Sequence, residues 1–258
     1  MNSFFKGVIL GLSILFILPS MAKECAERYV ISDFDDTIKT YGYPNRLMKM
    51  GNAIFRKKIN AGIGYLINAL STECDENQSF TVVTASPKLL TPVINNLMKK
   101  NNLTNYNLEL RPIASSTLEY KIKKVNEIYQ KENKPLILIG DDTAKDPDAY
   151  FDFALKNPSL HLATYIHNVK GRPVLFGQKN YITSYEIALH EFNNNRLNDR
   201  DALTVGIHIL AADQYEIIPR YGQCPSKYEL PETSDEDLNN LSKQIKVKIE
   251  EICRNRVN

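Results

Sequence analysis

Short, continuous runs of apolar residues alternate along this chain with stretches whose apolar residues recur every three or four positions. The first pattern predicts buried strands, and the second predicts helices with one buried face. The expected strands cover residues 29–32, 80–83, 135–139 and 162–166, with a short extended stretch near Leu108. The expected helices cover residues 46–70, 88–100, 117–131, 147–155, 184–193 and 235–254.

This alternation is typical of an α/β fold in which helices cover both faces of a parallel sheet. Ligands bind such sheets beyond the carboxyl ends of the strands. The residues that follow each strand are therefore the first candidates for a functional site. From residue 171 onward the pattern is helical with polar loops, which predicts a mainly helical extension over 171–258, packed on a core domain over 23–170.

Residues 1–22 have the pattern of a secretory signal peptide. Lys6 precedes an apolar stretch, and Ser20-Met21-Ala22 places small residues at the two positions that a signal peptidase inspects. The apolar stretch is short for a membrane span, which needs about 20 residues, and an uncleaved anchor is the alternative. We expect cleavage after Ala22 and a periplasmic or secreted protein.

All four cysteines follow this segment. An even number in an oxidising compartment predicts two disulfides. We expect the pairs Cys25–Cys74 and Cys224–Cys253, because shorter loops close more readily, and free structural thiols are the alternative. The formal net charge of +2 argues against a nucleic-acid-binding protein. We expect a monomer.

Acidic residues follow the first expected strand, in the stretch YVISDFDDTIK. Asp33 and Asp35 are two positions apart, so an extended backbone directs them to one face. In a dry pocket, both stay ionised only beside a cation, and a divalent cation prefers such oxygen ligands. One carboxylate can then attack phosphorus while the other handles the proton of the leaving group. Loop or helix-cap acids are the alternative. A calcium-binding EF-hand loop is excluded, because Ile38 and Pro44 stand where it needs Gly and Glu.

Hydroxyl groups follow the second expected strand. In VVTASP, Thr84 and Ser86 precede a helix N-terminus, and such groups can bind a phosphoryl oxygen. A plain N-cap is the alternative.

The helix expected over 117–131 places a lysine among its apolar residues. At about 100° per residue, Lys121 lies in the sector of Val125, whereas Lys123 points to the opposite side. A lysine in this position is unfavourable unless it pairs with an anion. A side chain whose ammonium reaches water is the alternative.

The stretch GDDTAKDPD follows the third expected strand and supplies Asp141 and Asp146. Together with Asp33 and Asp35, they complete a set of oxygen ligands suited to Mg²⁺. Helix capping is the alternative for Asp146.

The order of acid pair, hydroxyl, lysine and acid pair resembles the haloacid-dehalogenase superfamily, from about residue 29 to residue 169. The stretches SDFDDTIK, TASPKLL, ELRP, LILIGDDTAKDPDAY and YIHNV more closely resemble the catalytic domain of actin-patch-associated phosphatidate phosphatases and their bacterial relatives. The resemblance implies a three-layer, Rossmann-like parallel sheet, and the stretch between Thr37 and Phe80 leaves room for a small helical insert but not for a large cap.

The resemblance also implies catalytic roles. Asp33 would be the nucleophile that becomes an aspartyl-phosphate, and Asp35 would protonate the leaving oxygen and then activate water. Thr84 would bind the phosphoryl group, and Lys121 would offset negative charge on the nucleophile and the phosphate.

Mg²⁺ would be held by Asp33, the backbone carbonyl of Asp35 and Asp141, with Asp146 supporting the metal shell. The chain departs from the family at two positions that we expect near the rim, Lys88 in place of tryptophan and His167 in place of arginine.

The expected function is therefore that of an exported, Mg²⁺-dependent phosphomonoesterase acting on phosphatidate or a related phospholipid, with no nucleic-acid partner. A site with little cover suits bulky or membrane-held substrates. The alternatives are an acid phosphatase for nucleotides or sugar phosphates and a catalytically silent exported binding protein.

Overall fold

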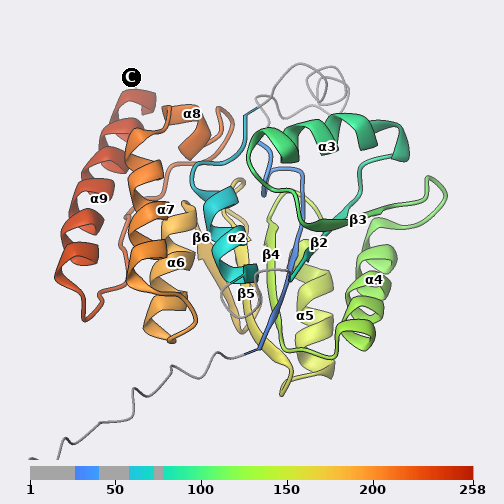
Figure 1. Cartoon of the computed structure of the whole chain (residues 1–258). Helices are drawn as coiled ribbons and strands as arrows, with labels where there is room; N and C mark the ends of the chain where they lie inside the picture. The colour runs from blue at the N-terminus through green and yellow to red at the C-terminus, as the bar shows by residue number, and fades with distance from the viewer. Residues whose placement is uncertain (1–26, 41–57, 73–77, 258) are drawn as a thin grey trace, which may run out of the picture.

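The computed structural model describes residues 27–40, 58–72 and 78–257 (Figure 1). The predicted signal peptide and the predicted Cys25–Cys74 disulfide lie outside these residues, as does the first half of the helix expected over 46–70. The predicted Cys224–Cys253 disulfide is confirmed.

Six parallel strands form one sheet in the order β3-β2-β1-β4-β5-β6. This confirms the predicted fold class, and the central strands β1, β2 and β4 are buried along their whole length, as continuous apolar runs require. The strands are β1 (Tyr29–Ser32), β2 (Phe80–Thr84), β3 (Tyr106–Leu110), β4 (Leu136–Asp141), β5 (His161–His167) and β6 (Gln178–Tyr181).

Helices cover both faces of the sheet and complete three layers (Figure 1). On one face, α4 (Thr117–Glu132) and α5 (Asp146–Lys156) enclose a core around Ile31, Leu138 and Phe153. The other face carries a larger core around Val30 and Ile139. Its helices are α2 (Ile63–Thr72), α3 (Thr91–Lys100), α6 (Ser184–Asn193), α7 (Asp199–Ala211) and α9 (Glu236–Val257).

Shorter helical turns complete the described chain. The 3₁₀ turn η1 (Lys88–Leu90) leads into α3, and α8 (Gln214–Ile217) follows α7. The described part of the segment between Thr37 and Phe80 ends in α2, whose buried Leu66 and Ile67 belong to the large core. In the described part of the chain, no helix is long and apolar enough to cross a membrane.

The C-terminal residues contribute one strand, β6, and two helices, α7 and α8, that the sequence pattern does not indicate. β6 reads QKNY and lies at the edge of the sheet, paired only with β5 among the described strands. An edge strand needs no continuous apolar run, because part of it stays exposed to water. The side chain of Asn198 caps α7 by accepting the Asp201 N–H at 2.8 Å. The division of the chain near residue 171 stays a prediction.

Candidate active site

The carboxyl ends of three neighbouring strands bring the polar residues of the site together. Asp33 directly follows β1, Thr84 ends β2 and Asp141 ends β4. These strands are adjacent and parallel, so their ends lie at one edge of the sheet. This is the edge at which α/β sheets bind ligands.

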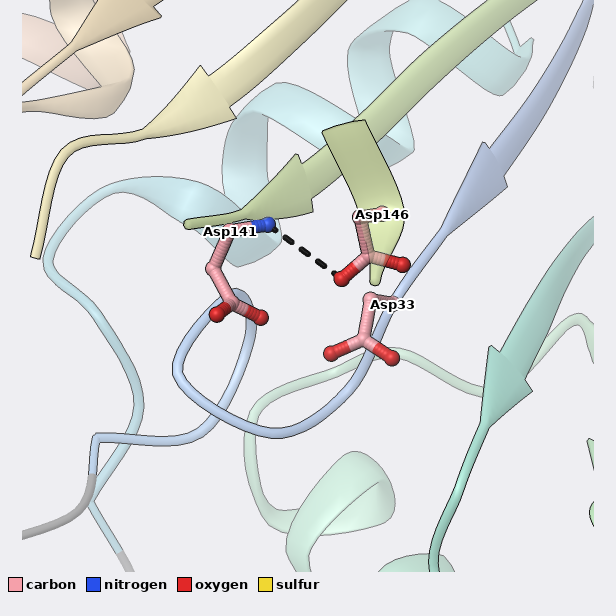
Figure 2. A group of neighbouring side chains, drawn as sticks. All are labelled: Asp33, Asp141 and Asp146. Atoms are coloured by element: carbon pink, nitrogen blue, oxygen red, sulfur yellow. Dashed lines mark hydrogen bonds between the residues drawn. The ribbon is translucent and has the colours of Figure 1, made fainter. Parts of the chain in front are cut away.

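Three carboxylates form a buried cluster at this edge. Oxygen atoms of Asp33, Asp141 and Asp146 all lie within 4.8 Å of one another. Figure 2 shows these side chains turned toward one another from the end of β1, the end of β4 and the start of α5. Gly140 permits this approach, since a Cβ atom there would lie 2.5 Å from Cβ of Asp146.

Lys121 joins the cluster from α4. Its Nζ donates to Oδ1 of Asp33 at 2.6 Å and also to Oδ1 of Asp146. Only 1% of its side chain is exposed, whereas 72% of the Lys123 side chain is exposed on the same helix. The helical periodicity therefore distinguishes the buried lysine from its solvated neighbour.

The charges of the cluster do not balance. Three carboxylates at −1 and one ammonium at +1 leave a net charge of −2 when all are ionised. Burial raises the pKa of Asp33 to about 8, because the loss of hydration outweighs the attraction of Lys121. Burial also raises the pKa of Asp141, and the neighbouring Asp146 adds to this effect. A divalent cation would supply the missing charge, and an all-oxygen donor set suits a hard cation.

The carboxylate of Asp35 lies apart from this cluster and faces the hydroxyls that follow β2. Its Oδ2 accepts a hydrogen bond from Ser86 Oγ at 2.8 Å and one from Thr84 Oγ1 at 3.4 Å. The Thr84 hydroxyl in turn accepts the Ser86 N–H at 3.0 Å. The structure thus adds Ser86 to the site as a direct partner of Asp35, and the metal contact expected from the Asp35 backbone carbonyl stays a prediction.

A further acid supports the loop that follows β5. Asp142 is fully buried and accepts the backbone N–H groups of Val169, Lys170 and Arg172 at 2.8–2.9 Å. This buried acid therefore acts as a loop anchor rather than as a member of the carboxylate cluster.

The two departures from the family pattern differ in their placement. Lys88 is exposed at the start of η1, in keeping with a rim position. The rim prediction for His167 is wrong, because His167 is only 2% exposed and stacks on Tyr181 with ring centroids 5.0 Å apart. Burial lowers the pKa of His167, and its Nδ1 donates to the backbone carbonyl of Asp36 at 2.6 Å.

The comparisons with known proteins agree with the resemblance drawn from the motifs. No curated protein and no solved structure matches the chain. A family match covers residues 28–168, which contain β1 to β5, the buried carboxylate cluster with its lysine, and Asp35 with its two hydroxyl partners. This span is more than half of the 258 residues, and the chain therefore belongs to the haloacid-dehalogenase-like family described as "Phosphatidate phosphatase APP1, catalytic domain".

Proposed function

We propose that the protein is an exported, Mg²⁺-dependent phosphatase that removes phosphate from phosphatidate or a related phospholipid through an aspartyl-phosphate. The observation that carries this proposal is the gathering of Asp33, Lys121, Asp141 and Asp146 in one buried cluster. Membership of a phosphatase family sets the reaction class.

In the first step, a carboxylate oxygen of Asp33 attacks phosphorus, and the bond from phosphorus to the ester oxygen breaks. Asp35 gives its proton to the leaving oxygen. In the second step, Asp35 takes a proton from water, whose oxygen attacks phosphorus. The bond between phosphorus and Asp33 then breaks, which releases phosphate and restores the carboxylate.

The neighbouring groups hold these two acids in place. The ammonium of Lys121 fixes the orientation of Asp33 and offsets negative charge as phosphorus is transferred. The hydroxyl of Ser86 orients Asp35, and Thr84 supplies a second hydroxyl on the same side. When bound among Asp33, Asp141 and Asp146, Mg²⁺ would neutralise charge on the phosphoryl oxygens.

The loops beside the site support a membrane-held substrate. Leu89, just after β2, is 83% exposed, and Ile113, just after β3, is 88% exposed. These two strands are adjacent and parallel, so the segments that carry both residues leave the sheet at the edge that holds the site. Lys88 is exposed beside Leu89. Apolar side chains beside a cation are suited to the interface of an anionic membrane.

Two features support export. Residues 1–22 have the signal-peptide pattern, and the Cys224–Cys253 disulfide suits an oxidising compartment.

The test is a panel assay of the purified protein without residues 1–22, with and without Mg²⁺. Phosphatidate in vesicles, nucleotides and sugar phosphates are the substrates. We expect Mg²⁺-dependent release of phosphate from phosphatidate, loss of turnover in Asp33→Asn and normal turnover in Asp152→Asn, which changes a partly exposed acid of α5 that pairs with Lys156. Preference for the soluble esters would favour the acid-phosphatase alternative, and no turnover on any ester would favour a binding protein.

A further inference from the structure

The turn that carries the two proposed catalytic acids has an unusual backbone conformation at Asp36. Its φ is +62°, in the left-handed region that residues other than glycine adopt uncommonly, Asp and Asn more often than the rest. The Asp36 N–H donates to the Lys39 carbonyl at 2.9 Å. The Asp36 carbonyl accepts from His167 Nδ1 at 2.6 Å and from Asn60 Nδ2 at 3.1 Å. Its Oδ2 accepts from Thr143 Oγ1 at 3.2 Å.

The other carboxylate oxygen of Asp36 binds the C-terminal part of the chain. Asp36 Oδ1 accepts a hydrogen bond from the hydroxyl of Tyr221, which lies 185 positions further along the chain. Asp36 is fully buried. The contacts from Asn60, Thr143 and His167 all come from within the family match over 28–168, whereas Tyr221 lies beyond it. We call residues 218–224 the strap.

Contacts on two sides fix the strap. On the side of the sheet, the Gln223 N–H donates to the carbonyl of Val169 at 3.0 Å, in the loop that buried Asp142 anchors. On the side of α9, Arg256 donates to three backbone carbonyls of the strap. The disulfide Cys224–Cys253 joins the end of the strap covalently to α9. These contacts fix the position of the strap, which carries the Tyr221 hydroxyl.

We propose that Tyr221 is a positioning residue, through which the strap holds the turn over 33–37 in its reactive conformation. Asp36 directly follows Asp35, so a change in the backbone at Asp36 would move the carboxylate that transfers the proton. Tyr221 acts through Asp36 and takes no part in the chemical steps. This inference rests on the proposed function, and it implies that C-terminal residues help to position a catalytic acid.

The test compares Tyr221→Phe with Tyr228→Phe. Each substitution removes one tyrosine hydroxyl from the C-terminal part of the chain. The hydroxyl of Tyr228 contacts Thr183 and Glu186 at 3.0 and 3.1 Å and lies outside the proposed site. We expect Tyr221→Phe to lower kcat about tenfold with little change in KM, as loss of a hydrogen bond to a charged group allows. Tyr228→Phe should retain the wild-type kcat.

A second readout does not depend on turnover. Amide hydrogen exchange in a peptide covering residues 33–40 should become about tenfold faster in Tyr221→Phe and stay unchanged in Tyr228→Phe. The double variant Cys224→Ser/Cys253→Ser should change exchange and kcat in the same direction. In a triple variant that also carries Tyr221→Phe, the fold-change in kcat should be smaller than the product of the fold-changes of the two separate variants, because both variants act through the strap.

Unchanged exchange over 33–40 in Tyr221→Phe would overturn the inference. Faster exchange with a wild-type kcat would also overturn it, because Tyr221 would then stabilise the turn without serving the reaction. If the wild-type protein hydrolyses no ester at all, the proposed function fails, and the same exchange measurement still decides whether the strap fixes the turn.

Discussion

Substitution of the buried Lys121 tests the charge balance of the carboxylate cluster most directly. Lys121→Met keeps an unbranched side chain of similar length and removes the ammonium that contacts Asp33 and Asp146. The three carboxylates, whose oxygens lie within 4.8 Å of one another, would then lose the positive charge that Lys121 supplies.

Removing one partner of a buried ion pair typically destabilises a protein by about 3–5 kcal/mol, because the remaining charge stays buried without compensation. Proton uptake by a carboxylate relieves part of this cost, and relief is greatest at low pH. The loss should therefore grow with pH, by at most about 1.4 kcal/mol per pH unit for each proton involved. Mg²⁺ should restore much of the loss, since it supplies the missing positive charge.

The assay is urea unfolding of Lys121→Met at pH 5 and pH 8, each with EDTA and with Mg²⁺. Lys123→Met is the matched control on the same helix, since its side chain is 72% exposed and its contact with Glu127 is 3.6 Å long. We expect the control to stay within about 0.5 kcal/mol of the wild type. If Lys121→Met lost no more stability than Lys123→Met, and did so independently of pH and Mg²⁺, the charge account of the cluster would be refuted.

Two further predictions concern the membrane and pH. Leu89→Ser/Ile113→Ser should lower activity on phosphatidate vesicles about thirtyfold, because each of the two exposed apolar side chains that enter the interface contributes on the order of 1 kcal/mol. The activity of this double variant on a soluble phosphomonoester should stay unchanged. The control Leu155→Ser changes an exposed leucine at the far end of α5 and should leave both activities unchanged. Equal losses on both substrates would contradict a docking role for Leu89 and Ile113. In EDTA, wild-type stability should fall as pH rises from about 4 toward 8, because the pKa of Asp33 is raised to about 8 in the folded state and the stabilising proton is lost over that range. Thermal unfolding across this pH range, repeated with Mg²⁺, checks the effect, and a flat profile in EDTA would contradict it.

The parts of the fold that local patterns encode were predictable from the sequence. Continuous apolar runs such as YVIS and FTVV predict buried parallel strands, and β1 and β2 occupy those residues. The acids that follow the strands meet because parallel strand ends share an edge. Lys121 was identifiable because helical periodicity places it in the apolar sector of α4.

The parts that depend on long-range contacts were not predictable in this way. β6 is short and polar, and its place comes from pairing with β5 rather than from a pattern of its own. The burial of His167 depends on the ring of Tyr181, which that edge strand supplies. Tyr221 gives no local signal at all, since only the folded chain brings it to Asp36. The hydroxyl of Ser86 was noted beside Thr84, but its contact with Asp35 required the structure.

In the proposed reaction, Asp33 receives the phosphoryl group beside a divalent cation held by the buried acids. The most direct measurement is a crystal structure of the protein with Mg²⁺ and beryllium trifluoride, which mimics a phosphoryl group on a carboxylate. We expect the fluoride complex to be bonded to a carboxylate oxygen of Asp33, with Mg²⁺ in contact with Asp33 and Asp141. Beryllium trifluoride bound elsewhere, or Mg²⁺ away from these acids under conditions that support turnover, would contradict it.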